Sequence, residues 1–225
     1  MIVVTGASRG LGSAIIKRLN SIKIETFGLA RNVDKIETAA LSCDVSDYAQ
    51  VKAAVSNIKK LNKPIDAIIN AAGIASMNLA VITPPKTTQR LINTNLLGTI
   101  YCSQLFAPLM IRKKTGVIIN FSTIAVSLGL KGESIYTASK AGVEGFTRAF
   151  AREMADFNIR VNCISPGPIN TDLLNGVSKE QINSIISKQI IPKQFNPSNI
   201  CDLIELLIDQ RSSSLSGQTL HVGGV

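Results

Sequence analysis

The chain opens with the stretch MIVVTGASRGLG, residues 1–12, in which a short apolar run leads into three closely spaced glycines and then a helical pattern. Glycine lets the backbone turn sharply and approach a ligand, and the free N–H groups at the start of a helix attract an anion. A strand, a glycine turn and a helix in this order therefore predict a pyrophosphate site. The spacing of Gly6, Gly10 and Gly12 is G-x-x-x-G-x-G, not the common G-x-G-x-x-G. Glycines that serve only a tight turn and helix packing are the alternative interpretation.

Short apolar runs alternate with longer segments of helical period along the rest of the chain. This alternation is typical of a parallel sheet covered by helices. It predicts an α/β fold, a doubly wound Rossmann sheet of about seven parallel strands with helices on both faces, in a single domain covering residues 1–225. The predicted strands are 2–4, 26–29, 41–43, 67–70, 117–121, 160–164 and 219–222. Long helices are predicted over 86–113 and 136–156, and the interval between Arg31 and Cys43 leaves room only for a turn or a stub of helix.

The composition excludes several classes of protein. At 225 residues with 45% hydrophobic and 17% charged residues, the chain is long and apolar enough to bury a core without disulfides. Four scattered cysteines without a C-x-x-C pair, and one histidine, argue against a metal site. The net charge of +9 is spread along the chain and aromatic residues are few, so the pattern favours an anionic small ligand over nucleic acid. Without a leader pattern or a long apolar run, we expect a cytoplasmic protein with no membrane partner.

Two tyrosines are each followed four residues later by a lysine. One pair is Tyr136 and Lys140 in SIYTASKAG, residues 134–142, and the other is Tyr48 and Lys52 in DYAQVKAAV, residues 47–55. At this spacing two helical side chains lie one above the other, whether or not they do chemistry. The spacing alone therefore does not identify a site, and the surrounding motifs must separate the two pairs.

The end of the second predicted strand bears on which dinucleotide would bind. NAD-specific folds place an acidic residue there for the ribose 2′-hydroxyl, but this stretch reads FGLARN and its first acid is Asp34. Arg31 lies in that region and Arg9 lies in the glycine loop, where both would attract a 2′-phosphate. The sequence therefore predicts NADP in preference to NAD, with an ordinary solvated Arg31 as the alternative.

Taken together, the glycine loop, the seven-strand pattern and the Tyr-x-x-x-Lys pair resemble the short-chain dehydrogenase/reductase family over nearly the full chain. TGASRGLG resembles the cofactor loop of that family, CDVSD its adenine-contacting stretch, INAAG its Asn-Asn-Ala-Gly motif with Ala71 at the second position, and SPGPINTD its segment beside the nicotinamide. The C-terminal SGQTLHVGGV is similar to the family ending, except that Gly223 stands where aspartate is common. The residues that the loop pattern and the resemblance assign to cofactor binding are Gly6, Ser8, Arg9, Gly10, Leu11, Gly12, Arg31, Asp44, Val45, Asn70, Ala71, Ala72, Gly73, Tyr136, Lys140, Pro166, Gly167, Ile169 and Thr171.

The same resemblance implies the catalytic residues Asn95, Thr123, Tyr136 and Lys140. Tyr136 would be the general acid and base, and Lys140 is expected to stabilise its phenolate, because an ordinary tyrosine has a pKa near 10. Counting back thirteen residues from Tyr136, the family's usual interval to its serine, gives Thr123, with Ser122 beside it as the alternative hydroxyl. Asn95, in NTNLLG, would position a water that relays protons to Lys140.

The resemblance implies an NADPH-dependent carbonyl reductase and, within the family, is strongest to the 3-oxoacyl-acyl-carrier-protein reductases. The basic residues 112–114 could meet an acidic carrier protein. A reductase for another small carbonyl, such as a steroid, sugar or pterin, and an NADP-binding regulatory protein without turnover are the alternatives. The apolar segment 173–193 would be the substrate lid. Helices 86–113 and 136–156 would form a homo-oligomer, either a tetramer or a dimer.

Overall fold

The computed structural model describes residues 1–225, and one parallel sheet runs through it in the order β3-β2-β1-β4-β5-β6-β7. The strands are β1 (Ile2–Thr5), β2 (Thr26–Ala30), β3 (Ala39–Ser42), β4 (Ala67–Asn70), β5 (Gly116–Phe121), β6 (Ile159–Pro166) and β7 (Thr219–Val222). The strand order reverses between β1 and β4, which pair in parallel from Ile2 with Ala67 to Thr5 with Asn70. The predicted seven-stranded parallel sheet is therefore confirmed, and a ligand is expected at this reversal, outside the carboxyl ends of the strands.

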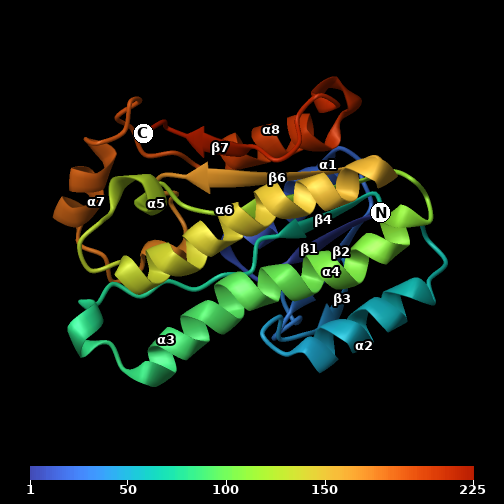
Figure 1. The fold of residues 1–225 in the computed structure, drawn as a ribbon, viewed down its shortest axis with the longest axis horizontal. Helices are drawn as coiled ribbons and strands as arrows, with labels where there is room; N and C mark the ends of the chain where they lie inside the picture. Colours follow the sequence, from blue (N-terminus) through green and yellow to red (C-terminus); the bar gives the residue numbers. More distant parts are fainter.

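Helices cover both faces of the sheet (Figure 1). They are α1 (Gly10–Ser21), α2 (Tyr48–Lys59), α3 (Pro85–Leu91), α4 (Gly98–Ile111), α5 (Ala125–Leu128), α6 (Ser134–Met154), α7 (Lys179–Ile186) and α8 (Pro197–Ile208). Short 3-10 turns are η1 (Ala80–Ile82), η3 (Ala155–Phe157), η4 (Asp172–Leu174) and η5 (Gln210–Ser212). None of the helices is both long and apolar enough to cross a membrane.

The strands alternate their side chains between two separate cores. Val3, Ile68 and Ile118 face one core, with α2, α4 and α6 packed on it. Val4, Ile69 and Ile119 face the other core, where α1 and α8 pack. Because both faces of each central strand are buried, the strands read as continuous apolar runs, which is why the sequence revealed them.

The predicted helix over residues 86–113 is wrong in one respect, because a π-helical segment interrupts it. α3 ends at Leu91, the π segment η2 covers Ile92–Leu97, and α4 continues from Gly98. Periodicity does not reveal such an insertion, since apolar residues recur on both sides of it. Single π turns inside α-helices are frequent at functional sites, and this one contains Asn95.

The predicted strands 67–70 and 219–222 match the structure, and the other predicted boundaries differ from it by at most two residues. The short connection after β2 contains turns and no helix, as the spacing predicted. β3 begins two residues before its predicted start, and its side chains are half-buried or exposed, because it is the edge strand. Edge strands have a weaker apolar signal than central ones, so their ends are harder to place.

Candidate active site

The glycine loop lies at the reversal of strand order, between the carboxyl ends of β1 and β4. Gly6 has a φ of 67°, and a Cβ placed there would lie 2.8 Å from the Ala72 Cα and 2.9 Å from the Ala71 oxygen. A Cβ at Gly12 would overlap the carbonyl group of Gly6. The loop is further tied to β4 by the Ala72 N–H, which donates to the Thr5 hydroxyl over 3.1 Å. Glycine is therefore required at Gly6 and Gly12, because two backbone segments approach each other closely there. The N-terminus of α1 then faces the crevice beyond the strands.

The predicted nucleotide side of the site carries exposed positive charge. Arg9 precedes α1 and Arg31 follows β2, and both are exposed and outside any salt bridge. Asp44 accepts hydrogen bonds from the Ser46 N–H and hydroxyl, at 3.0 and 2.7 Å, and Val45 is buried. The loop after β3 is therefore held in a fixed turn by its own aspartate.

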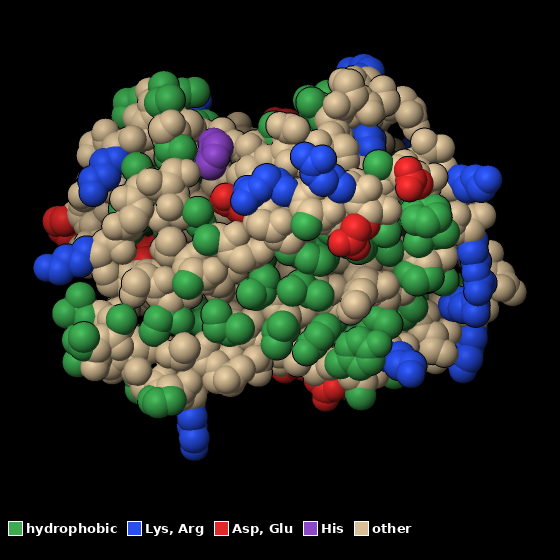
Figure 2. All heavy atoms as spheres, in the orientation of Figure 1, with side chains coloured by type: hydrophobic (Ala, Val, Ile, Leu, Met, Phe, Trp, Pro, Cys, Tyr) green, Lys and Arg blue, Asp and Glu red, His purple; other side chains and the backbone are tan.

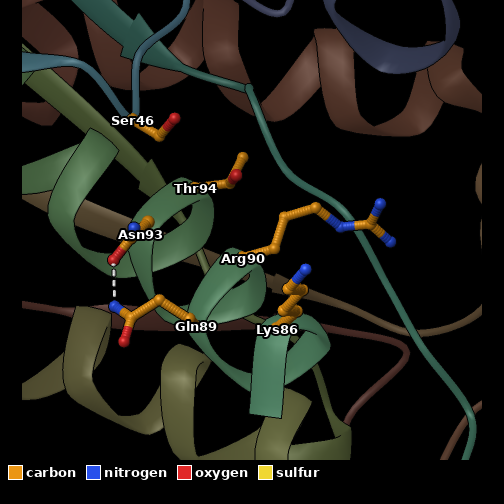
Figure 3. Close-up of a pocket in the computed structure, with 6 residues that line it drawn as sticks. All are labelled: Ser46, Lys86, Gln89, Arg90, Asn93 and Thr94. Atoms are coloured by element: carbon orange, nitrogen blue, oxygen red, sulfur yellow. Dashed lines mark hydrogen bonds between the residues drawn. The ribbon is translucent and has the colours of Figure 1, made fainter. Parts of the chain in front are cut away.

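A polar hollow of about 280 Å³ borders this turn (Figure 3). The residues that line it are Ser46, Lys86, Gln89, Arg90, Asn93 and Thr94. None of the predicted site residues lines the hollow, although Ser46 directly follows Val45 and Thr94 precedes Asn95. Its two cations add to the positive field on the predicted nucleotide side.

The end of β4 approaches the predicted catalytic lysine. Asn70 is buried, and its side-chain amide donates to the Ser103 hydroxyl and to the Asn120 side-chain oxygen. Three residues later, a Cβ at Gly73 would lie 3.4 Å from the Asn95 side-chain oxygen and 3.5 Å from the Lys140 Nζ. The structure therefore brings the INAAG motif, Asn95 and Lys140 into one cluster.

Tyr136 and Lys140 are both buried on one face of α6, at 8% and 5% exposure. The Lys140 ammonium donates to the Phe121 carbonyl oxygen over 2.8 Å, at the end of β5. Burial lowers the pKa of Lys140 to about 8. Because α6 packs across the ends of β5 and β6, the pair lies at the carboxyl edge of the sheet, where the glycine loop also lies.

The surroundings of Tyr136 shift the pKa of its phenol in both directions. Burial raises the pKa of Tyr136, the carboxyl group of Glu133 raises it further, and a hydrogen bond with the Thr123 side chain acts in the opposite direction. The phenol is therefore held in its protonated form, the form that a proton donor needs. Glu133 was not among the predicted site residues. The signal that could have revealed it is its position three residues before Tyr136, on the same helix face.

The π segment η2 presents the side chain of Asn95 to two different elements. Its side-chain oxygen accepts from the Ile74 N–H, and its amide donates to the Ile74 oxygen and the Ser139 hydroxyl, all within 3.0 Å. Ser139 in turn donates to the Tyr136 carbonyl oxygen. Asn95 thus connects the segment after β4 to α6, beside Lys140.

Ser122 and Thr123 follow β5, and their hydroxyl groups contact different side chains. The Ser122 hydroxyl donates to a carboxyl oxygen of Glu144 over 2.5 Å, while the Thr123 hydroxyl lies against the Tyr136 phenol. Neighbouring residues in extended chain point to opposite sides, so only one of the two hydroxyls can reach the tyrosine. The geometry favours Thr123, as the interval from Tyr136 does.

A pair of substitutions separates the two hydroxyls. We expect Thr123→Val to lower kcat for carbonyl reduction by about a hundredfold or more, because one hydrogen bond to the developing oxyanion is lost. Ser122→Ala should stay within about threefold of the parent, because its hydroxyl is committed to Glu144. Steady-state NADPH oxidation measures both, and a larger loss in the serine variant would assign the role to Ser122.

The segment after β6 lies under the predicted lid. Gln189, which is 5% exposed, packs where a Cβ at Gly167 or Gly223 would stand, and its amide donates to the Lys193 carbonyl over 3.0 Å. Gly223 has a φ of 99°, so the family's aspartate would be strained here and would meet Gln189. The packing of Gln189 therefore explains why this chain has glycine at position 223, where the family commonly has aspartate. Thr171 lies beside Gly10 of the glycine loop, because a Cβ at Gly10 would be 3.8 Å from the Thr171 Cβ.

The second Tyr-x-x-x-Lys pair has different surroundings. Tyr48 and Lys52 lie on α2 with exposed side chains, and the Tyr48 ring packs edge-on against Tyr101 at 5.2 Å. Neither residue approaches the glycine loop or a strand end. The structure therefore places this second pair on the exposed side of a surface helix.

The comparisons agree with this geometry. Residues 1–182 match the model of the short chain dehydrogenase family. The chain is 32% identical over 239 residues to a 3-oxoacyl-acyl-carrier-protein reductase FabG of Staphylococcus epidermidis, covering 99% of this chain and 96% of that protein. Among solved structures it is similar to a 3-oxoacyl-acyl-carrier-protein reductase from Brucella melitensis, with TM-score 0.89, 28% identity and coverage of 100% and 90% of the two chains. It is equally similar to the aldohexose dehydrogenase of Thermoplasma acidophilum, with TM-score 0.89, 29% identity and coverage of 99% and 92%.

The chain therefore belongs to the short-chain dehydrogenase/reductase family and is an oxidoreductase of that family. A nicotinamide cofactor follows from the family. The residues present fit it, because Gly6 and Gly12 allow the close backbone approach that holds the loop at the N-terminus of α1, where N–H groups can bind a phosphate.

Proposed function

We propose that this protein is an NADPH-dependent reductase of 3-oxoacyl thioesters, with Tyr136 as proton donor. The main observation behind this proposal is that four side chains come together beside the glycine loop, at the carboxyl ends of the strands. They are Tyr136, Lys140, Thr123 and Asn95. The relatives named 3-oxoacyl-acyl-carrier-protein reductases support the substrate class. The aldohexose dehydrogenase supports a second candidate, the oxidation of a sugar by the same hydride transfer run in the opposite direction.

In the proposed mechanism, the bound cofactor supplies a hydride to the substrate carbonyl carbon. The carbonyl π electrons move to the oxygen, and the Tyr136 hydroxyl gives that oxygen its proton. Thr123 holds the oxygen by a hydrogen bond, and the Lys140 ammonium stabilises the phenolate that remains. Asn95 orders the segment beside Lys140. The tyrosine would regain its proton by way of Lys140. Gly6, Gly12 and the residues of INAAG and SPGPINTD would bind the cofactor.

The test of this function is NADPH oxidation by the purified protein across a panel of carbonyls. The panel contains acetoacetyl-coenzyme A, a small diketone and a pterin aldehyde as hydride acceptors, and an aldohexose is tested as a hydride donor by the formation of NADPH from NADP. Turnover of the thioester with the highest kcat/KM supports the proposal. A preference for the sugar would favour the second candidate, and cofactor binding without turnover of any substrate would defeat the reductase function.

The predicted preference for NADPH rests on Arg31 and Arg9. We expect Arg31→Ala to weaken NADPH binding by about tenfold and leave NADH binding within about twofold, because a guanidinium pairs with the 2′-phosphate that only NADPH carries. Isothermal titration with each nucleotide measures the two affinities. Lys17→Ala is a matched control, since Lys17 is also exposed but pairs with Glu37. Equal losses for both nucleotides in Arg31→Ala would refute the assignment.

We further propose that the protein forms a homo-oligomer through α4 and α6. α4 is apolar around its whole circumference, yet Tyr101, Leu105 and Leu109 are only partly buried. Figure 2 shows hydrophobic side chains gathered on this face, over α4 and the edge of α6. A helix that is apolar on all sides is normally buried, which a second copy of the chain would achieve. The mass in solution tests this, and a monomer at micromolar concentration would contradict it.

A cytoplasmic location and a single domain with residues 173–193 as its lid remain proposals. Docking of a carrier protein on residues 112–114 has little structural backing, because the Lys113 ammonium pairs with Asp66. Lys86 and Arg90, at the polar hollow, are outside any salt bridge, so they are the better basic pair for an acidic partner.

A further inference from the structure

A chain of buried polar side chains lies in the core behind the candidate active site. The side-chain amide of Asn70 on β4 donates to the Ser103 hydroxyl of α4 over 3.0 Å and to the Asn120 side-chain oxygen of β5 over 2.8 Å. The Asn120 amide donates in turn to the Thr147 hydroxyl of α6 over 2.9 Å. None of these four residues is more than 2% exposed. Two strands and two helices are thereby tied together inside the core.

These polar side chains lie only at the end of the strands that carries the site. Two residues before Asn70 and Asn120 on the same strands, Ile68 and Ile118 face the same core. Burying an amide is costly, and the Asn70 side-chain oxygen is left without a partner even here. Apolar groups of the same shape can be as stable as a buried hydrogen-bonded pair. What the hydrogen bonds add is a defined distance and direction between the elements that they join.

The end of β5 is bound to α6 at two successive residues. The Asn120 side chain holds Thr147, and the carbonyl oxygen of the next residue, Phe121, accepts from the Lys140 ammonium over 2.8 Å. Lys140 and Thr147 are seven residues apart, which is two turns, so they lie on the same face of α6. The Asn120–Thr147 bond therefore anchors that face of α6 to the strand that also binds Lys140.

The thiol of Cys163, on β6, lies beside both of these α6 side chains. Burial raises the pKa of this thiol, while the Lys140 ammonium and a hydrogen bond with the Thr147 side chain act in the opposite direction. Cys163 also pairs with Asn120 in the register of the sheet. Because protein interiors are close-packed, a shift of α6 at Thr147 is passed on to the space that Lys140 occupies.

We propose that Asn120 and Thr147 are positioning residues, which hold α6 against the end of β5 so that the Lys140 ammonium stays fixed beside Tyr136. This inference rests on the proposed function, in which that ammonium stabilises the Tyr136 phenolate. Asn120 and Thr147 are fully buried, so they act through Lys140 and not on the substrate. Loss of their bond weakens an interaction made in the transition state, which lowers kcat more than it changes KM.

The kinetic test replaces the Thr147 hydroxyl by a methyl group. We expect Thr147→Val to lower kcat for acetoacetyl-coenzyme A by about tenfold and to leave KM within about twofold, because a displaced catalytic group costs rate and not binding. Thr147→Ser keeps the hydroxyl and should retain kcat within about threefold of the parent. NADPH oxidation at varied substrate concentration measures both constants.

Thr26→Val is the control with the same chemical change. Thr26 is 2% exposed, and its hydroxyl donates to the Asn20 side-chain oxygen over 2.7 Å. It is the first residue of β2, at the end of the sheet opposite the glycine loop. The variant loses a buried hydrogen bond as Thr147→Val does, so its Tm should fall while kcat stays at the value of the parent.

The position of Lys140 can also be measured without any substrate. In protein prepared with isotope-labelled lysine, the Nζ resonance of Lys140 is identified by its absence from Lys140→Met. This resonance should be unchanged in Thr147→Ser and in Thr26→Val. In Thr147→Val it should shift and exchange faster with water, because the bond to the Phe121 carbonyl is weakened.

Three results would overturn the inference. They are equal losses of kcat in Thr147→Val and Thr26→Val, a loss in Thr147→Ser as large as in Thr147→Val, and an unchanged Lys140 resonance in Thr147→Val. If the parent protein reduces no thioester, the proposed function is wrong, and the Lys140 resonance alone then decides the role of Thr147. Thermal unfolding monitors the fold. If Thr147→Val does not fold, Thr147→Ala replaces it in both measurements, because it removes the hydroxyl without placing a methyl group against Asn120.

Discussion

Replacing Tyr136 by phenylalanine should abolish carbonyl reduction while NADPH still binds. The substitution removes only the hydroxyl that gives its proton to the substrate oxygen, and general acid catalysis is worth about a hundredfold to ten-thousandfold in rate. The ring that fills the buried space beside Thr123 is kept, so the fold should be unchanged. NADPH oxidation measures the activity, and a fluorescence titration with NADPH measures the binding.

Tyr48→Phe is the matched control for this prediction. Tyr48 also has a lysine four residues later, but it is exposed on α2, away from the sheet ends. It should keep full activity. If Tyr136→Phe stays within about tenfold of the parent, Tyr136 is not the proton donor, and another hydroxyl near Thr123 must take its place.

Replacing Gly12 by alanine should destroy the cofactor cradle. The added methyl group would overlap the backbone carbonyl of Gly6, which cannot move independently because Gly6 is itself pressed against Ala71 and Ala72. Overpacking of this kind costs about 1–3 kcal/mol. For a chain of this size, each kcal/mol lowers Tm by roughly 2–4 °C. We also expect NADPH affinity to fall by at least about tenfold, because the N–H groups that face the phosphates shift with the loop.

Gly145→Ala is the control with the same chemical change. Gly145 lies inside α6, and a Cβ there would meet no atom within 4 Å. Alanine favours a helix interior by about 0.5–1 kcal/mol over glycine, so Tm should rise slightly and NADPH affinity should not change. Thermal unfolding and nucleotide titration of both variants provide the measurement. An unchanged affinity in Gly12→Ala would show that the loop does not bind the dinucleotide.

Local sequence patterns were sufficient for the sheet, and they also pointed to most of the residues that we propose for the site. The central strands are buried on both faces, so their continuous apolar runs marked them without ambiguity. Gly6 and Gly12 appeared as a motif because close backbone approach tolerates no other residue. Tyr136 and Lys140 stood out from Tyr48 and Lys52 through the motifs around them, which parallel strands bring to one edge.

Other features depend on contacts between residues far apart in the chain. The π segment around Asn95 exists because its side chain is bound by Ile74 and Ser139, and no short-range pattern encodes that. The hydroxyls of Ser122 and Thr123 can be distinguished only by the residues that they contact, which are Glu144 and Tyr136 respectively.

The sequence by itself determined the apolar runs of the strands and the glycine loop, because each depends on residue type and local spacing, and the resemblance of its motifs to a family suggested the side chains that we propose to react. Only the tertiary structure decided how far each ionisable group is removed from water. Burial lowers the pKa of Lys140 and raises those of Tyr136 and Glu133, since desolvation acts against whichever form is charged. Desolvation is a property of the packed molecule, because it depends on which groups the fold removes from water, and no local spacing specifies that.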